Sequence, residues 1–186
     1  MYTLHMIKEV DEMKEHTGIK GWVLSGSHPE HYEMKVDTKT FRSGGKSGLL
    51  KAIAKVTEKE FATMMQSFQA KEYKRKRIKL SGYLKTENAA KCIVWMQIDN
   101  HDGDIIQFDN MNQRSIQGTT DWNQYSIVLD VPEESSFIHF GVLLRGKGKV
   151  WIDSFTFENV DIHTPTTNMI KKEKLLGYPT NLSFTK

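Results

Sequence analysis

The chain has little cysteine, no long apolar run and almost no excess of charge, and each lack excludes a class of protein. Cys92 is the single cysteine among 186 residues, which excludes an internal disulfide and a zinc site built from cysteines. No apolar run approaches the roughly 20 residues of a membrane-spanning helix. Charged residues crowd segment 1–16, where a secretory signal needs an uncharged apolar centre. A cytoplasmic location without a membrane partner is therefore expected.

The small net charge argues against a nucleic-acid partner. The formal net charge of +3 is too low to imply direct nucleic-acid binding. The densest basic segment, 74–79, fits a solvated turn and an edge strand, where lysines hinder pairing with other sheets. A phosphate contact at this segment is the alternative. The sequence therefore predicts no direct nucleic-acid binding. Separately, the length of 186 residues favours one domain with short extensions.

Short segments rich in β-branched and aromatic residues fill most of the chain. In segment 149–158 a glycine turn leads into Val, Ile, Trp, Thr and Phe, which favour a strand over a helix. The predicted strands are 20–25, 31–36, 47–55, 61–69, 77–86, 91–99, 104–109, 123–131, 136–144 and 149–158, with turns at 26–29, 43–46, 100–103, 118–121 and 145–148. Many short strands at this spacing indicate a β-sandwich or a barrel.

The two ends of the chain differ from this central region. Residues 1–19 have apolar residues at helical spacing and predict an N-terminal helical extension. Residues 20–162 contain the strands and are predicted to form a ligand-binding β-sandwich domain. Residues 163–186 are predicted to be a C-terminal tail with a short helix at 168–176, because prolines and a charged segment replace the strand pattern.

Alternation along three strands separates an apolar face from a mixed face. Neighbouring residues of a strand point to opposite sides, so Leu80, Val94 and Met96 are predicted to lie in the core. Sugar rings stack on aromatic side chains, and their hydroxyls pair with polar ones. The mixed face is therefore predicted to bind a saccharide or a similar small polar ligand, although a plain half-polar sheet face is the alternative. The predicted ligand-binding residues are Tyr83 and Trp95 as stacking rings, Gln97, His139 and Arg145 as hydrogen-bonding groups, and Asn110 and Arg114 at the rim.

Three motifs in order resemble a known family of domains. Segment 73–86 has a tyrosine turn before an alternating strand, segment 118–132 has a Trp-x-x-Tyr strand ending in Val-Pro, and segment 148–157 closes with Val-Trp-Ile-Asp. Together they resemble the galactose-binding-like jelly-roll domains, which include many carbohydrate-binding modules. The resemblance implies an all-β jelly-roll β-sandwich of two antiparallel sheets, with ligand on the concave sheet face. It also favours a strand at 61–69, where periodicity alone fits helix and strand almost equally.

A narrower resemblance concerns segments 21–29, 64–68 and 108–114. They are similar to an uncharacterised bacterial version of this sandwich, which occurs alone or attached to AraC-type transcriptional regulators. The resemblance implies an effector-sensing or protein-interaction domain, with a regulator protein as partner, as the alternative to saccharide binding. The chain shows no helix-turn-helix segment of its own.

Metal and catalytic motifs are weak in this sequence. Related sandwiches hold a structural calcium near the end of their last strand, which implies Asp153 as a candidate ligand; capping of a turn is its alternative role. His28 and His31 flank Pro29, but no third metal ligand is apparent, so a turn with a packing histidine is predicted. Serine-hydrolase and metalloprotease motifs are missing. A non-catalytic module is therefore predicted, with no cofactor other than that calcium and with a glycoside-active hydrolase as the alternative.

Overall fold

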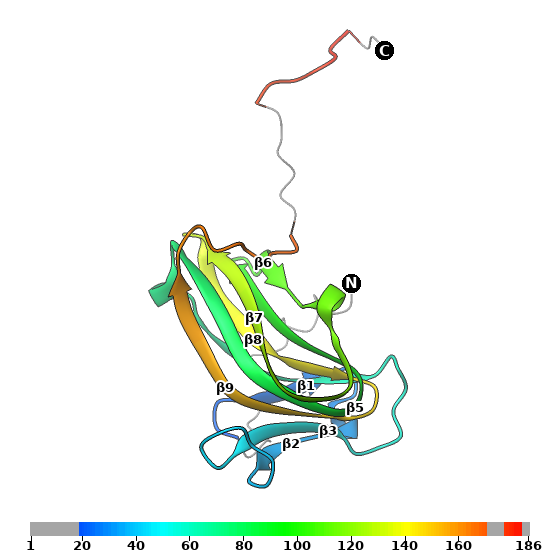
Figure 1. Cartoon of the computed structure of the whole chain (residues 1–186). Helices are drawn as coiled ribbons and strands as arrows, with labels where there is room; N and C mark the ends of the chain where they lie inside the picture. The colour runs from blue at the N-terminus through cyan, green and yellow to red at the C-terminus, as the bar shows by residue number, and fades with distance from the viewer. Residues whose placement is uncertain (1–18, 171–176, 184–186) are drawn as a thin grey trace.

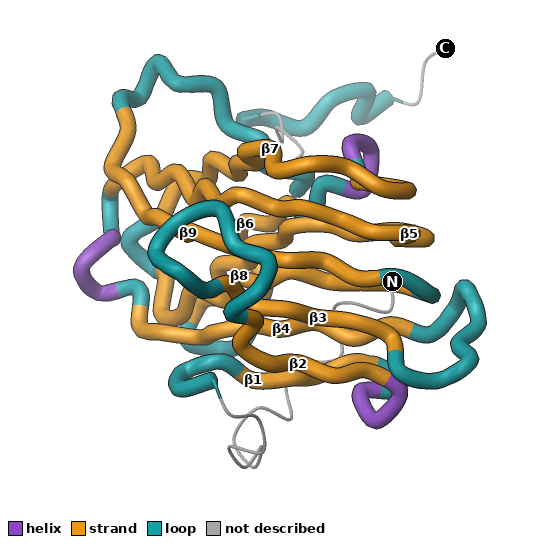
Figure 2. Tube along the Cα trace, turned by 60° about the horizontal axis from the view of Figure 1, so that its bottom comes forward, coloured by secondary structure: helices purple, strands orange, loops and turns teal. Residues whose placement is uncertain are grey.

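Nine antiparallel strands lie side by side in the described part of the chain (Figures 1 and 2). The coordinates are a computed structural model that describes residues 19–170 and 177–183. The strands are β1 (Val23–Gly26), β2 (Tyr32–Asp37), β3 (Ser47–Ala52), β4 (Phe61–Gln69), β5 (Lys76–Asn100), β6 (Ile105–Asp109), β7 (Ile116–Val131), β8 (Ser135–Arg145) and β9 (Lys149–Val160), with short 3₁₀ turns η2 (Pro29–His31), η3 (Lys71–Tyr73) and η4 (Asn112–Arg114). The helical extension predicted at 1–19 lies, except for its last residue, outside the described residues.

The long strand β5 belongs to two layers. Its first half pairs with β7 and β9, and its second half pairs with β6 and β8. The strand order is β1-β4-β8-β5-β9-β3-β2, with β6 and β7 added on β5. We call β1, β4, β8, β6 and the second half of β5 layer 1, and β2, β3, β9, β7 and the first half of β5 layer 2. The all-β jelly-roll β-sandwich predicted from the sequence is confirmed.

The core lies between the two layers. Leu80 and Met96 have no exposed surface, and Val94 is almost fully buried, as their alternation predicts. The strand predicted at 61–69 is confirmed, since β4 pairs with β1 on one side and β8 on the other. Because β4 is buried on both faces along most of its length, its apolar residues need not alternate. Their helix-like spacing is therefore compatible with a strand.

Two predicted boundaries are wrong, and bulges explain both. The predicted strands 77–86 and 91–99 are one continuous strand, and the turn predicted at 118–121 is part of β7. The register between β5 and β7 shifts repeatedly around Thr86 and Ala89, and Gly118 adopts a φ of 74°. Bulges bend a strand without ending it, so β5 passes from layer 2 to layer 1, and β7 stays paired with it as far as Cys92.

The predicted C-terminal tail begins along the sheet edge. The Thr167 amide donates to the Val128 carbonyl at 2.8 Å, and the Met169 amide donates to the Phe108 carbonyl at 2.7 Å. Residues 168–170 are not helical, and most of the helix predicted at 168–176 lies outside the described residues. None of the helical turns in the described part of the chain has the length and apolar character needed to cross a membrane.

Gly141 of β8 provides a test of the packing in layer 1. A Cβ atom at this position would lie 2.4 Å from the Met64 carbonyl oxygen and 3.0 Å from the Met65 Cα, and these backbone atoms cannot move aside cheaply. We expect Gly141→Ala to lower the free energy of unfolding by about 1–3 kcal/mol, as overpacking does. Urea titration measures this change. Gly177→Ala is the control, because its Cβ would meet nothing within 4 Å, and equal stabilities of the two variants would contradict the packing described.

Candidate functional site

The two predicted stacking rings, Tyr83 and Trp95, do not share a face. Tyr83 lies in the half of β5 that pairs with β7 and β9, and Trp95 in the half that pairs with β8. Each points outward from its own layer, because Leu84 and Val94 beside them point into the core. The predicted shared stacking surface is therefore wrong. Alternation along one strand assigns inside and outside, but it does not reveal that the strand passes between layers.

Trp95 is also closed to a ligand. Its side chain is 3% exposed, and its indole N–H donates to Thr63 Oγ1 at 2.8 Å. Trp95 stands opposite Gly141 in register, so the indole reaches across a position of β8 that has no side chain to meet Thr63 on β4. The ring is thus a structural contact between strands in layer 1.

Tyr83 is covered by a loop that Asp153 organises. Asp153 Oδ2 accepts hydrogen bonds from the Arg42 and Ser43 amides at 2.8 and 3.0 Å, and Asp153 Oδ1 accepts one from Ser154 Oγ at 2.8 Å. The Arg42 guanidinium carbon lies 3.6 Å from the centre of the Tyr83 ring, in a cation–π contact. Capping, the alternative role considered for Asp153, is therefore present. Calcium binding by Asp153 stays a prediction.

Gln97 and His139 do come together, on the outer face of layer 1. His139 of β8 lies opposite Ser67 of β4 on one side and Gln97 of β5 on the other. The next row, two residues farther along, completes a group of polar and aromatic side chains. We call this group the His139 patch, and its members are Ser67, Gln69, Gln97, Asp99, Phe137 and His139.

Polar contacts connect the members of the His139 patch. His139 Nδ1 lies 2.7 Å from Ser67 Oγ, and His139 Nε2 lies 3.4 Å from Asp99 Oδ2. Gln97 Nε2 donates to both oxygens of Asp99, at 2.9 and 3.1 Å. Gln97, Asp99 and His139 are buried, whereas Ser67 is exposed. Buried polar groups that satisfy one another have fixed orientations, so the patch presents a preorganised polar floor.

Phe137 is the exposed ring of the patch. Its side chain is 43% exposed, and its ring centre lies 6.2 Å from that of His139. Phe137 is not among the predicted ligand-binding residues, although it stands two residues from His139 on the same side of β8. Only exposure distinguishes it from Trp95, and a sequence pattern does not contain that information.

The remaining predicted residues lie apart from the patch or are already engaged. Arg145 is ~20 Å along β8 from His139, by the rise of a strand, and packs near Phe61. Arg114 Nη2 pairs with the Asp109 carboxylate and donates to the Ser126 carbonyl at 3.2 Å. Asn110 Oδ1 accepts a hydrogen bond from the Asn112 amide at 3.0 Å. Asn110 and Arg114 therefore shape the loop between β6 and β7.

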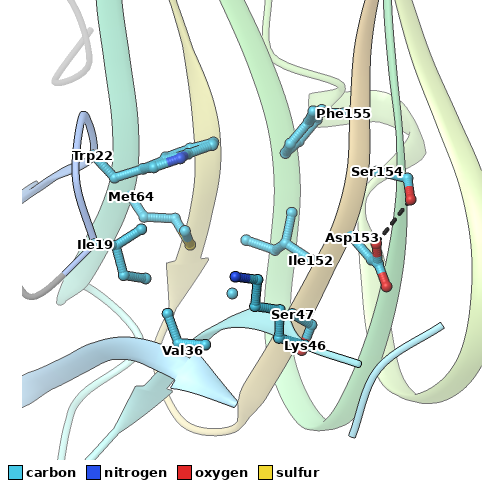
Figure 3. Close-up of a pocket in the computed structure, with 11 residues that line it drawn as sticks. Ile19, Trp22, Val36, Lys46, Ser47, Met64, Ile152, Asp153, Ser154 and Phe155 are labelled. Carbon is cyan, nitrogen blue, oxygen red and sulfur yellow. Dashed lines mark hydrogen bonds between the residues drawn. The ribbon is translucent and has the colours of Figure 1, made fainter. Parts of the chain in front are cut away.

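A cavity of about 260 Å³ opens between the layers, at the edge next to β1 (Figure 3). Its walls are mostly apolar, with Trp22, Met64 and Phe155 among them. Lys46 lines the mouth, and in Figure 3 its nitrogen extends toward Met64 and Ile152. Asp153 and Ser154 also line the mouth, but they point toward each other. The cavity therefore combines apolar walls with one ammonium group.

Comparison with known proteins supports both resemblances found in the sequence. No protein-family model matches the chain. Over 167 residues, 89% of this chain, it is 50% identical to an uncharacterised helix-turn-helix-type transcriptional regulator, YbfP, of Bacillus subtilis strain 168. The chain spans 57% of that regulator's length. The predicted similarity to regulator-associated domains is thereby confirmed.

Several solved structures with a similar fold are carbohydrate-binding modules. The xylan-binding domain CBM22-1 of Paenibacillus barcinonensis Xyn10C superposes with a TM-score of 0.54 and 19% identity, over 78% of this chain and 90% of that one. The C-terminal family 22 carbohydrate-binding module of Clostridium thermocellum Xyn10B superposes with a TM-score of 0.55 and 13% identity, over 76% of this chain and 86% of that one. The chain has the carbohydrate-binding-module fold. A module named TmCBM61, solved with β-1,4-galactotriose, superposes with a TM-score of 0.51 and 13% identity, over 76% of this chain and 90% of that one.

The pKa of Asp153 predicts how the loop over Tyr83 responds to acid. Partial burial raises this pKa, but hydrogen bonds from Ser154 and from the Ser43 and Arg42 amides outweigh burial and leave it below its usual 3.8. A lowered carboxyl pKa stabilises the fold above the unfolded-state pKa, and that contribution is lost as the pH falls through the folded-state pKa.

We therefore expect Asp153→Asn to lower the free energy of unfolding at neutral pH by about 1 kcal/mol. Hydrogen bonds to a charged carboxylate are stronger than those to a neutral amide, and solvent around this exposed loop keeps the difference small. The difference from the unsubstituted protein should shrink as the pH falls below the usual carboxyl pKa. Urea titrations at neutral and acidic pH measure it, with Asp102→Asn in the exposed turn after β5 as control. A pH-independent difference would show that the charge of Asp153 has no role.

Proposed function

We propose that this domain is a non-catalytic ligand-binding module that binds a saccharide at the His139 patch. The observation that carries the proposal is an exposed aromatic ring beside preorganised polar groups on one sheet face. Phe137 offers a surface for the C–H side of a sugar ring, and Ser67 and Gln69 offer exposed hydrogen-bonding groups next to it. The similarity of fold to xylan-binding and galactotriose-binding modules supports this ligand class.

Hydrogen bonding in the patch favours hydroxyl groups as ligands. Ser67 Oγ contacts His139 and is exposed, so it can donate to or accept from a sugar hydroxyl while the contact to His139 is kept. Asp99 holds Gln97 and lies near His139, which limits the orientations that these side chains can adopt. Binding then requires little ordering of the protein side chains, and this reduces the entropic cost.

The same geometry does not favour glycoside cleavage. That reaction ordinarily uses two carboxyl groups on either side of the scissile bond. The His139 patch contains one, Asp99, which is 5% exposed and has both oxygens engaged by Gln97. The patch therefore supports binding rather than hydrolysis.

Substitution of Phe137 tests saccharide binding. We expect Phe137→Ala to weaken binding of xylo- or β-1,4-galacto-oligosaccharides by about tenfold, because a stacking ring contributes about 1 kcal/mol or more. Isothermal titration calorimetry with both oligosaccharide series measures the affinity. Phe41→Ala is the matched control, since Phe41 is 42% exposed and stands in a loop away from the patch. An affinity that Phe137→Ala leaves unchanged, or no binding across both series, would refute the proposal.

A second candidate function is effector sensing for a transcriptional regulator. The 50% identity to a helix-turn-helix-type regulator favours it, and the cavity between the layers supplies a place for an effector. Lys46 forms no ion pair with the described residues, and its ammonium group lies at the mouth of apolar walls. A small carboxylic acid with an aromatic or branched apolar group matches this combination in charge and in size.

Lys46 provides the test of this second function. Phenylacetate is the probe, and its neutral amide is the comparison ligand. We expect Lys46→Met to weaken phenylacetate binding by about tenfold, because an ion-assisted hydrogen bond is worth about 1.5 kcal/mol or more. Tryptophan fluorescence and NMR titration measure the affinities.

Two further variants make that test specific. Lys39→Met removes an exposed lysine from the same loop and should leave binding unchanged. Gly48→Val fills the cavity, since a Cβ there would lie 3.1 Å from Met64 Cε, and should abolish binding of acid and amide alike. Equal binding of phenylacetate and its amide, or equal effects of the two lysine variants, would exclude a carboxylic acid effector at this cavity.

A further inference from the structure

The η2 turn between β1 and β2 brings together side chains of the types that can bind metal ions. His28, Glu30 and His31 each offer one ligand atom, and these atoms all lie within 4.8 Å of one another. The two imidazole rings are stacked, with centres 5.2 Å apart and an angle of 13° between their planes. The sequence alone showed no third ligand for the histidine pair; the turn places the Glu30 carboxylate beside it, with His28 Nδ1 3.0 Å from Glu30 Oε1.

The backbone explains why the two histidines meet. Residues three apart in a 3₁₀ turn lie above one another, and Pro29 stands at the start of η2, where its fixed φ suits the turn. The His31 amide donates to the His28 carbonyl at 3.1 Å. The Tyr32 hydroxyl, directly after the turn, donates to the Glu60 and Gly146 carbonyls at 3.0 and 3.1 Å. The turn is therefore anchored to two other parts of the chain.

Glu60 positions one of the histidines. Its Oε2 lies 2.8 Å from His31 Nδ1, and its Oε1 accepts a hydrogen bond from Thr57 Oγ1 at 3.0 Å. A carboxylate on Nδ1 places the ring proton there and leaves Nε2 with a free lone pair, which is the usual arrangement behind a metal-binding histidine. His31 is thus oriented in advance.

We propose that His28, Glu30 and His31 bind a divalent transition-metal ion of the zinc class, with Glu60 as the positioning residue of His31. Two imidazole nitrogens and one carboxylate oxygen suit Zn²⁺, Ni²⁺ or Cu²⁺ rather than Ca²⁺, which prefers oxygen ligands. Metal–ligand distances of about 2.0–2.2 Å require the three atoms to approach to ~3.3 Å. The exposed side chains of His28 and Glu30 can rotate to close this gap while Glu60 holds His31.

The test uses the whole chain, freed of metal with a chelator, and titrated with Zn²⁺ and with Co²⁺. Calorimetry reports the zinc affinity, and the visible absorption of Co²⁺ reports the ligand set. We expect one site, lost in His28→Gln and in His31→Gln. Glu60→Gln should weaken zinc binding by about tenfold or more and keep the stoichiometry, because outer partners of metal-bound histidines contribute 10–100-fold.

Matched histidine variants distinguish a specific metal site from nonspecific binding to exposed histidines. His101 and His163 are exposed and lie elsewhere, so His101→Gln and His163→Gln should leave the affinity unchanged. Urea titration of each metal-free variant verifies that it folds. An affinity unchanged in His28→Gln, or reduced equally by all four histidine variants, would mean an adventitious ion only and would overturn the proposal.

Discussion

The passage of β5 from one layer to the other is the constraint on which the rest of the structure depends. This 25-residue strand supplies a pairing partner to β7 and β9, and then to β6 and β8. Its inward residues fill the core on both sides of the bend, so the two layers cannot shift independently. The same passage sends Tyr83 and Trp95 outward from different layers, and it therefore decides which side chains lie together on one face.

The outer face of layer 1 divides into a closed part and an open part. Trp95 and Thr63 pair across β8 and are buried, whereas Phe137 and Ser67, farther along β8 and β4, are exposed. Between them, His139 links the buried polar groups to the surface. The open part has a floor of buried polar side chains and an accessible ring, and the proposed saccharide site depends on both.

Much of the fold could be predicted from the sequence, because strand alternation and turn residues are local signals. Leu80, Val94 and Met96 lie in the core, as their spacing predicts. The turn at 100–103 is stabilised by Asn100 Oδ1, which accepts hydrogen bonds from the Asp102 and Asp104 amides at 3.0 and 2.8 Å. The bulges around Ala89 could not be predicted, since they arise where β5 meets β7. Of the predicted ligand-binding residues, Gln97 and His139 share a surface, because they are neighbours across two strands with one outward face.

The sequence by itself determined the class of fold, the strands and the side of each strand that is apolar, because these follow from local propensity and from a period of two. Tertiary structure decided which outward residues are accessible. Arg42 covers Tyr83 because Asp153, far along the chain, caps its loop, and Glu60 orients His31 across a similar separation. Contacts between distant segments set exposure and side-chain orientation, and recognition depends on both.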